Sequence, residues 1–171
     1  MKKSFLLLTS VIVLLTACGD SSSKQDAPAA PEATVEAVNP ADETIAEPAY
    51  ITISAGDDMK YDLTEITVKE GQTVNLTLKH TGTLAKTAMG HNFVLLANGV
   101  DLAAFANAAV NAADNDYIPK TMDKDVIAHT QTIGGGETTE IEFQAPEKGT
   151  YDFLCSFPGH FAMMKGKFIV E

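Results

Sequence analysis

Three side chains that could bind a soft metal ion lie close together near the end of the chain: Cys155, His160 and Met164. An apolar, strand-like run at 150–155 carries the cysteine, and a Pro-Gly pair at 158–159 predicts a turn that returns the histidine and the methionine towards it. A thiolate, an imidazole and a thioether suit copper, which changes between Cu(I) and Cu(II), better than a hard ion such as magnesium. The spacing therefore predicts a copper-binding loop.

A second imidazole would complete this site, and His91 is the best candidate because it stands in a Gly-His-Asn triplet before a predicted strand. Two histidines and a cysteine with a distant thioether form the trigonal ligand set of blue-copper electron-transfer sites. Either Met163 or Met164 could supply the thioether. The alternative is an enzyme in which Cys155 is a nucleophile and His160 or His91 is its base, but it gives the methionine and the triplet no role.

The segments that must position these ligands have the pattern of a β protein. An alanine-rich stretch from Val100 to Ala113 predicts one short inserted helix. Regularly spaced short strands favour a sandwich or a barrel. Apolar alternations between turn residues predict strands at Ile51–Ile53, Ile66–Val68, Val74–Leu78, Phe93–Leu96, Val126–Ala128, Thr138–Phe143, Thr150–Cys155 and Lys167–Val170.

The N-terminus indicates export and lipid attachment. Residues 1–17 have the basic start, the apolar run and the small residues of a secretory signal peptide, and the run is shorter than the roughly 20 residues that span a membrane. The sequence Leu-Thr-Ala-Cys at 15–18 resembles the lipobox of bacterial lipoproteins, in which the cysteine becomes the lipidated N-terminus. We therefore expect acyl chains such as palmitate on Cys18 and a lipid-anchored protein. The alternative is a soluble secreted protein with a chance cysteine at the cleavage site.

Lipidation of Cys18 would leave Cys155 without a disulfide partner, because the chain has 2 cysteines. The export compartment normally oxidises thiols in pairs. A lone exported thiol therefore needs an explanation as a buried bystander, a nucleophile or a metal ligand.

Composition separates a tether from a folded domain. Residues 18–49 are rich in Ala, Pro, Glu and Ser, which predicts a disordered tether. Residues 50–171 contain 16 acidic residues and 9 lysines, a net charge of −7, and are long enough for one domain with a core. The full chain has a net charge of −11 and no arginine, which argues against a nucleic-acid partner.

The runs Met89–Asn92, Val126–Thr130 and Cys155–Gly166 together resemble azurin, a member of the cupredoxin family, over about residues 51–171. With its lipobox and tether, the chain resembles the lipid-modified azurins of bacterial envelopes. The resemblance implies an all-β Greek-key cupredoxin sandwich or barrel with one short inserted helix. The chain departs from the family in two respects: it has no cysteine left for the disulfide usual near the start of the fold, and Phe93 stands where tryptophan is frequent.

The same resemblance implies one type 1 copper ion held by His91, Cys155 and His160. It selects Met164 as the distant axial ligand, because the methionine of azurins lies four residues after the loop histidine. It also implies a weak approach of the Gly90 carbonyl from the opposite side, where a side chain would leave little room.

Further roles follow from the resemblance alone. The Asn92 side chain would tie the His91 loop to the Cys155 loop. His80 matches a partly buried family histidine, for which a structural role is favoured over an influence of pH on the copper, and His129 is expected at the surface. Electrons would pass through an apolar patch that permits brief docking, although Phe157 and Leu84 could instead belong to the core. The matching patch positions are Met59, Leu84, Ala88, Met89, Phe157, Pro158, Ala162 and Met163.

These features predict an electron carrier and not an enzyme. It would shuttle single electrons between redox proteins of the cell envelope, with c-type cytochromes or copper oxidoreductases as transient partners. The lipid anchor would hold it at a membrane facing the periplasm, and Gly19 after the lipidated cysteine favours the outer membrane. The alternative function is a lipoprotein that buffers or delivers copper without obligatory redox partners, which would favour more exposed methionine or histidine donors.

Overall fold

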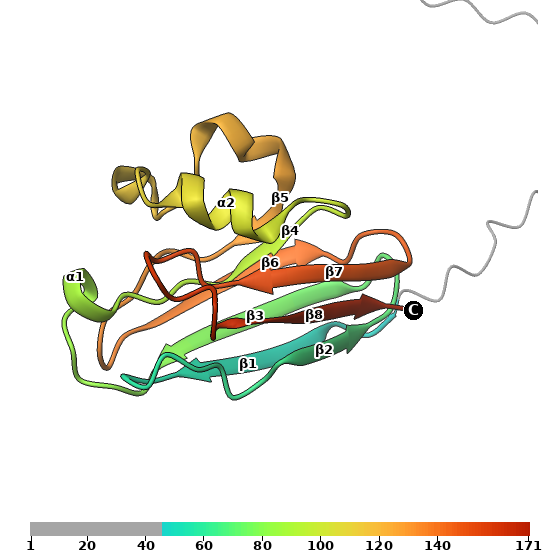
Figure 1. Ribbon diagram of the computed structural model, residues 1–171. Helices are drawn as coiled ribbons and strands as arrows, with labels where there is room; N and C mark the ends of the chain where they lie inside the picture. The colour runs from blue at the N-terminus through green and yellow to red at the C-terminus, as the bar shows by residue number, and fades with distance from the viewer. Residues whose placement is uncertain (1–45) are drawn as a thin grey trace, which may run out of the picture. The chain divides into compact units, whose positions relative to one another are not determined.

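The computed structural model describes residues 46–171. The expected signal peptide, the lipidation site Cys18 and the tether up to residue 45 lie outside the described residues. Within the described part, β-strands form two sheets, the helical segments between residues 102 and 125 lie to one side of them, and a single helical turn at 86–89 lies at one end (Figure 1). No helix in this part of the chain has both the length and the apolar character needed to cross a membrane.

The smaller sheet has three strands in the order β1-β3-β6 and the larger has five in the order β2-β8-β7-β4-β5. Strand β1 pairs in parallel with β3 and β2 in parallel with β8, whereas the remaining neighbours are antiparallel. In both sheets, strands that are not consecutive in the sequence lie next to each other, which is typical of a Greek-key sandwich. The expected all-β fold is confirmed. The strands are β1 (Ala49–Ala55), β2 (Glu65–Val68), β3 (Thr73–His80), β4 (Val94–Leu96), β5 (Val126–His129), β6 (Thr138–Gln144), β7 (Gly149–Leu154) and β8 (Lys165–Val170).

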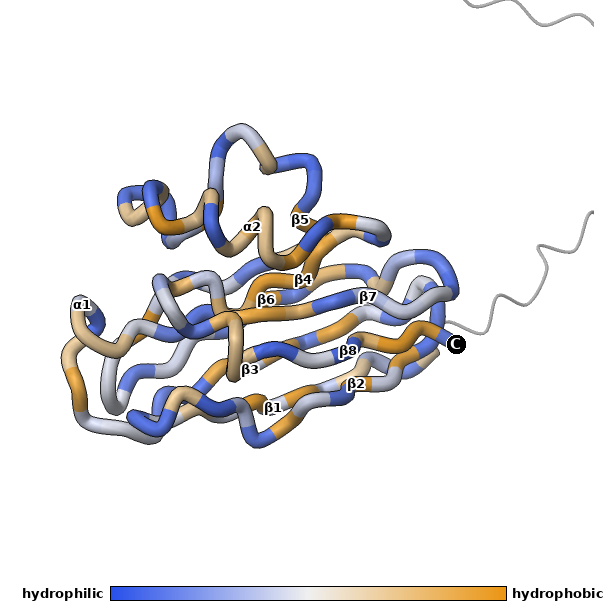
Figure 2. Tube along the Cα trace, in the orientation of Figure 1, coloured by the Kyte–Doolittle hydropathy of each residue, from blue (hydrophilic) through white to orange (hydrophobic). Residues whose placement is uncertain are grey.

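The core follows from the alternation of apolar residues along the strands, which is visible in the hydropathy colouring of Figure 2. Val74, Leu76 and Leu78 alternate along β3, and all three are fully buried. They share one hydrophobic cluster with Phe153 of β7 and Phe168 of β8. Because successive side chains of a strand point to opposite faces, this period directs one face of each sheet into the sandwich.

Asp101 is the N-cap of helix α2 (Leu102–Ala109), and its carboxylate accepts hydrogen bonds from the amides of Ala103 and Ala104 at 2.9 and 3.0 Å. The buried helix residues Phe105 and Ala106 belong to a second apolar cluster that includes Val94 and Leu96 of β4. The helix is shorter than the predicted range 100–113. The chain continues instead into two 3₁₀ turns, η1 (Ala113–Asn115) and η2 (Lys120–Asp125).

Several chain segments meet at one end of the sandwich. The parallel strands β1 and β3 both end there, at Ala55 and His80. A single helical turn that the sequence pattern did not indicate, α1 (Lys86–Met89), precedes His91, which forms an isolated bridge with Ile133. Strand β7 ends at Leu154 opposite the start of β8, so the loop 155–164 closes the same end.

Candidate metal centre

The structure brings His91, Cys155 and His160 together, with their ligand atoms all within 4.8 Å of one another. The Sγ atom of Cys155 lies 3.7 Å from Nδ1 of His160. His91 and Cys155 are fully buried, and His160 is 4% exposed. A buried group of one sulfur and two ring nitrogens is a donor set that favours copper or zinc over hard cations.

The loop between β7 and β8 folds back through its own backbone hydrogen bonds. The amide of Cys155 donates to the Met164 carbonyl at 3.0 Å, and the Met163 and Met164 amides donate to the His160 carbonyl at 3.0 and 2.9 Å. Gly159 allows the reversal because its φ of +84° favours glycine. Met164 is fully buried and shares a cluster with Cys155, whereas Met163 is 59% exposed.

His91 has one ring nitrogen prepared for a ligand. Its Nε2 lies 2.8 Å from the Gly56 carbonyl oxygen, which can only accept, so this nitrogen carries the proton. The other nitrogen, Nδ1, is buried without a hydrogen-bond partner among the described residues. A buried polar atom without a partner is unfavourable unless something binds it, and a metal ion in the cluster would do so.

Burial sets the protonation of the candidate ligands in the metal-free protein. It lowers the pKa of His160 to about 4 and also lowers the pKa of His91, so both imidazoles are neutral and able to coordinate near pH 7. Burial raises the pKa of Cys155 to about 12. The cysteine is therefore a thiol until a metal ion displaces its proton.

Gly90 lies between the histidine loop and the cysteine loop. Its carbonyl oxygen is 3.9 Å from Sγ of Cys155. A Cβ atom at this position would meet the Phe157 ring and the Lys86 carbonyl oxygen, both at 2.7 Å. The backbone φ is an ordinary −68°, so close packing explains the glycine here and not an unusual backbone conformation.

The Asn92 side chain connects the segment that carries His91 with the loop that carries Cys155. Its Oδ1 accepts from the Ser156 amide at 2.9 Å, and its Nδ2 donates to Ser156 Oγ at 2.8 Å. Its backbone carbonyl accepts a hydrogen bond from the buried Tyr61 hydroxyl. The roles of Tyr61 and Ser156 could not be predicted from the sequence, because no local spacing links either residue to Asn92.

The remaining histidines differ in their environment. His80 is buried and stacks on His91 with a ring separation of 4.3 Å. Its Nε2 lies 2.8 Å from the Met89 carbonyl, and its Nδ1 accepts from the Gly82 amide at 3.1 Å, so both nitrogens are engaged in positioning backbone. His129 is exposed.

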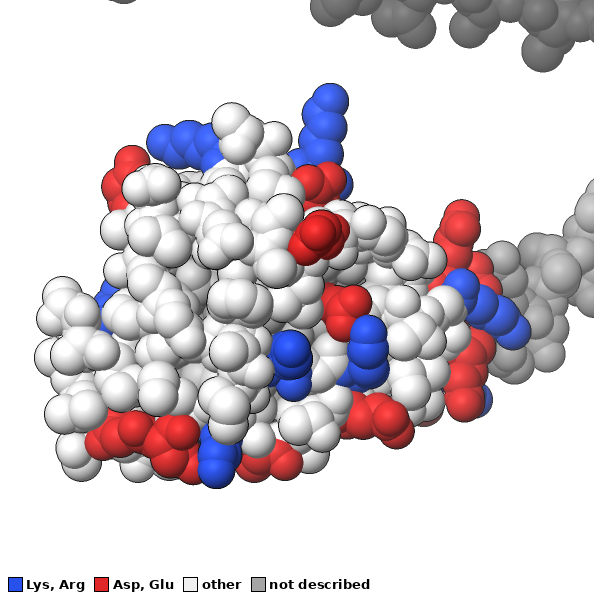
Figure 3. Space-filling view, in the orientation of Figure 1, with Lys and Arg blue, Asp and Glu red and all other residues white. Residues whose placement is uncertain are grey.

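Most of the expected patch residues lie at the surface around this centre. Met59, Leu84 and Met163 are 36%, 43% and 59% exposed. Ala88 and Ala162 are exposed, and Met89 and Pro158 are half-buried. Figure 3 shows that the end bearing α1 is largely uncharged in this view, with acidic side chains along its lower border.

Phe157 differs from the other patch residues because it is buried. Its ring packs 5.0 Å from the Tyr117 ring and 4.7 Å from the His160 ring, so it supports the surface from beneath.

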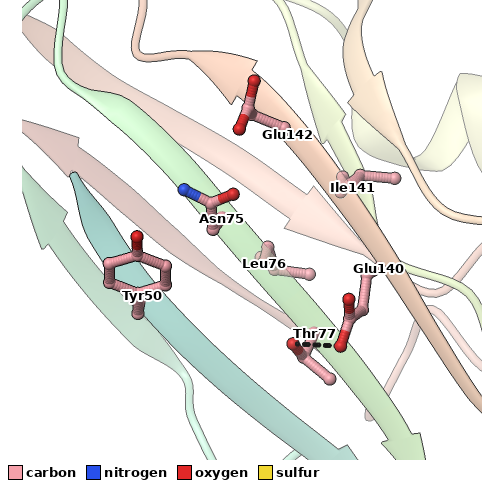
Figure 4. Close-up of a pocket in the computed structure, with 7 residues that line it drawn as sticks. All are labelled: Tyr50, Asn75, Leu76, Thr77, Glu140, Ile141 and Glu142. Atoms are coloured by element: carbon pink, nitrogen blue, oxygen red, sulfur yellow. Dashed lines mark hydrogen bonds between the residues drawn. The ribbon is translucent and has the colours of Figure 1, made fainter.

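A separate hollow on the three-stranded sheet, lined by Tyr50 and Glu140 among others, shares no residue with the metal cluster (Figure 4).

Comparisons with known proteins agree with this geometry. The family of copper binding proteins described as plastocyanin/azurin matches residues 49–171. Azurin-1 of Alcaligenes xylosoxydans xylosoxydans is 43% identical over 120 residues, which cover 68% of this chain and 92% of that protein. Outer membrane protein H.8 of Neisseria gonorrhoeae is 42% identical over 120 residues, or 68% of this chain and 64% of that longer protein.

Solved structures show the same likeness. Auracyanin A, a blue copper protein from the green thermophilic photosynthetic bacterium Chloroflexus aurantiacus, has a TM-score of 0.66 and 35% sequence identity, over 72% of this chain and 99% of that chain. Reduced auracyanin from Roseiflexus castenholzii has a TM-score of 0.65 and 38% identity, over 73% of this chain and 98% of that chain.

Proposed function

Because the chain belongs to the plastocyanin/azurin family of copper-binding proteins, we propose that it is a type 1 copper electron carrier tethered at the cell envelope. Its cofactor is copper, and His91, Cys155 and His160 form the candidate site. The observation that carries the proposal is the buried His91 Nδ1, which has no hydrogen-bond partner in the described part of the chain. A purely structural histidine would pair this atom.

In this proposal His91, Cys155 and His160 would hold the copper ion, and Met164 and the Gly90 carbonyl would add weaker donors. Copper bound there would supply a one-electron couple between Cu(I) and Cu(II). The protein contributes a site that excludes water and changes little in shape. Its ligand loop is closed by backbone hydrogen bonds between positions 155 and 164 and is tied to the histidine loop through Asn92.

Electrons would enter and leave through the apolar surface above His160. The exposed side chains of Met59, Leu84, Ala88, Ala162 and Met163 offer a surface without fixed charges, which suits brief contacts with changing partners. Redox proteins such as c-type cytochromes or copper oxidoreductases are the proposed transient partners. In this role the protein is a carrier and not an enzyme.

The anchor is a separate part of the proposal. Lipid on Cys18 would hold the domain at residues 50–171 to a membrane of the cell envelope through the tether at 18–49, with the outer membrane favoured. Support comes from the lipobox-like sequence at 15–18 and from the 42% identity with outer membrane protein H.8. Mass spectrometry of the membrane fraction should find acyl chains on the N-terminal peptide, and Cys18→Ser should release the protein from the membrane.

Electron exchange tests the carrier function directly. Reduced c-type cytochrome is mixed with the oxidised copper-loaded protein in a stopped-flow instrument. We expect Met163→Lys to slow the bimolecular reaction by about tenfold, because a charge replaces an exposed apolar side chain at the docking surface. The matched control is Tyr50→Lys, at the far end of β1, which should leave the rate unchanged.

Equal slowing by both variants would contradict docking at the metal end. Failure of the copper-loaded protein to accept electrons would instead favour the alternative, a protein that buffers or delivers copper. Burial of the cysteine and both histidines speaks against that alternative, because a delivery protein must release its ion readily.

A further inference from the structure

Asp116 lies outside the proposed ligand set and contacts several segments of the chain near the metal centre. The residue follows the 3₁₀ turn η1, in the connection between α2 and β5 (Figure 1). Its Oδ1 accepts from the Thr132 amide at 2.8 Å and lies 3.8 Å from Nζ of Lys86 in α1. Its backbone carbonyl accepts from the Asn92 side chain at 2.8 Å and from the Thr132 hydroxyl at 3.3 Å.

Asp116 adopts an unusual backbone conformation. Its φ and ψ of 50° and 32° are left-handed, and Tyr117 follows with φ 59°. Two consecutive non-glycine residues in this region are uncommon, and each is disfavoured about 5- to 30-fold relative to the right-handed form. Aspartate tolerates it better than most residues. Here its carboxylate also accepts a hydrogen bond from the amide of Thr132, which lies 16 residues away in sequence.

This conformation helps to determine which way the Asn92 amide points. Asn92 Nδ2 has two hydrogens, one donated to Ser156 Oγ and one to the Asp116 carbonyl. If the amide were reversed, its oxygen would face the Asp116 carbonyl oxygen and its nitrogen would face the Ser156 N–H group. Both contacts would be repulsive, so the Asp116 carbonyl and the Ser156 N–H group together select the orientation in which Asn92 Oδ1 accepts from the Ser156 amide.

We propose that Asp116 is a positioning residue of the metal centre. Its left-handed backbone presents a carbonyl that orients Asn92, and Asn92 in turn fixes Ser156 and thereby the backbone next to Cys155. The following residue adds a second contact, because the Tyr117 ring lies edge-on to Phe157 of the same loop at 5.0 Å. The effect of Asp116 on copper rests on the function proposed above, whereas the effect of Asp116 on the loop does not.

The test compares substitutions that differ in their tolerance of the left-handed conformation. Asp116→Leu keeps the approximate shape but disfavours this conformation and removes the acceptor for the Thr132 amide. Asp116→Asn keeps both and loses only the charge that faces Lys86. Hydrogen exchange of the Ser156 amide is measured by NMR in the metal-free full-length chain, relative to the Leu76 amide, which reports global opening in the core strand β3.

We expect the relative protection of the Ser156 amide to fall about 5- to 30-fold in the leucine variant and to stay unchanged in the asparagine variant. Equal loss in both variants, or loss in neither, would overturn the proposal. If the leucine variant does not fold, Asp116→Gly provides the second test, because glycine adopts the left-handed form freely and should retain the protection. A loss of protection in that variant would also overturn the proposal.

A second readout separates positioning from mere stabilisation. After loading with Cu(II), the leucine variant should show altered visible absorption ratios and copper hyperfine splitting, whereas the asparagine variant should match the unmodified protein. Altered exchange with unaltered spectra would overturn the role at the metal centre and leave the role in the loop. If the unmodified protein gave no blue spectrum, the proposed function would fail while the exchange result would still decide the role of Asp116 in the loop.

Discussion

The buried thiol of Cys155 should make the metal-free protein lose stability in alkaline solution. Burial raises the pKa of this thiol from 9.0 to about 12, so the folded chain keeps a proton that the unfolded chain has lost. The unfolded state is therefore favoured as the pH rises above 9. The stabilising contribution is complete below that pH and is lost progressively towards pH 12.

The magnitude follows from the difference between the two pKa values. Each pH unit between them costs about 1.36 kcal/mol of unfolding free energy, so the loss from Cys155 between pH 8 and pH 10 is about 1.4 kcal/mol. Burial also raises the pKa of Tyr61, which adds a smaller alkaline loss of its own. That loss is shared by a variant without the thiol and cancels in the comparison.

The assay is urea unfolding of the metal-free, reduced protein at pH 8, 9 and 10, for the unmodified chain and for Cys155→Ala. The alanine variant is less stable at pH 8 because it leaves a small cavity, but it has no thiol to titrate. We expect the unmodified chain to lose about 1.4 kcal/mol more than the variant between pH 8 and pH 10. An equal loss in both proteins would refute the assignment of a strongly raised pKa to this thiol.

Three further outcomes follow from the same geometry. Copper uptake near pH 7 should release about one proton per ion, from Cys155, measured by titration calorimetry in buffers of different ionisation enthalpy; release of none would mean that the thiolate exists beforehand. Tyr61→Phe should lower the unfolding free energy by about 1–3 kcal/mol, because the buried Asn92 carbonyl loses its donor, and denaturant midpoints that do not move would contradict this. Gly90→Ala should cost about 1–3 kcal/mol in the same assay, because its Cβ would meet the Phe157 ring, and an unchanged stability would show that the ring can move freely.

The positions of the strands along the chain were largely predictable from the sequence. Period-2 alternation, as in Val74, Leu76 and Leu78, depends on a local property of the strand and appears directly in the chain. The end of α2 was harder to predict, because the alanines after residue 109 are compatible with a helix. The chain leaves the helix there to enter the 3₁₀ turns, and local propensity does not indicate that change.

The meeting of His91, Cys155 and His160 was predictable, because Cys155 and His160 lie in one loop and His91 stands in a recognisable triplet. The contacts that support them were not. The hydrogen bond from Tyr61 to Asn92 spans 31 residues of the sequence. The hydrogen bond from Asn92 to Asp116 depends on a left-handed backbone that no local motif indicates. The reason for glycine at position 90 likewise became clear only from the position of the Phe157 ring. The ligand roles of Met164 and the Gly90 carbonyl stay predictions.

Addition of Cu(II) to the purified metal-free protein, followed by visible and EPR spectroscopy, shows directly whether the buried cluster forms a blue-copper centre. We expect one copper ion per chain, intense blue charge-transfer absorption that bleaches on reduction, and loss of that absorption in Cys155→Ala. A colourless product, or a blue spectrum that persists in the alanine variant, would contradict a copper centre built on the buried His91, Cys155 and His160 cluster.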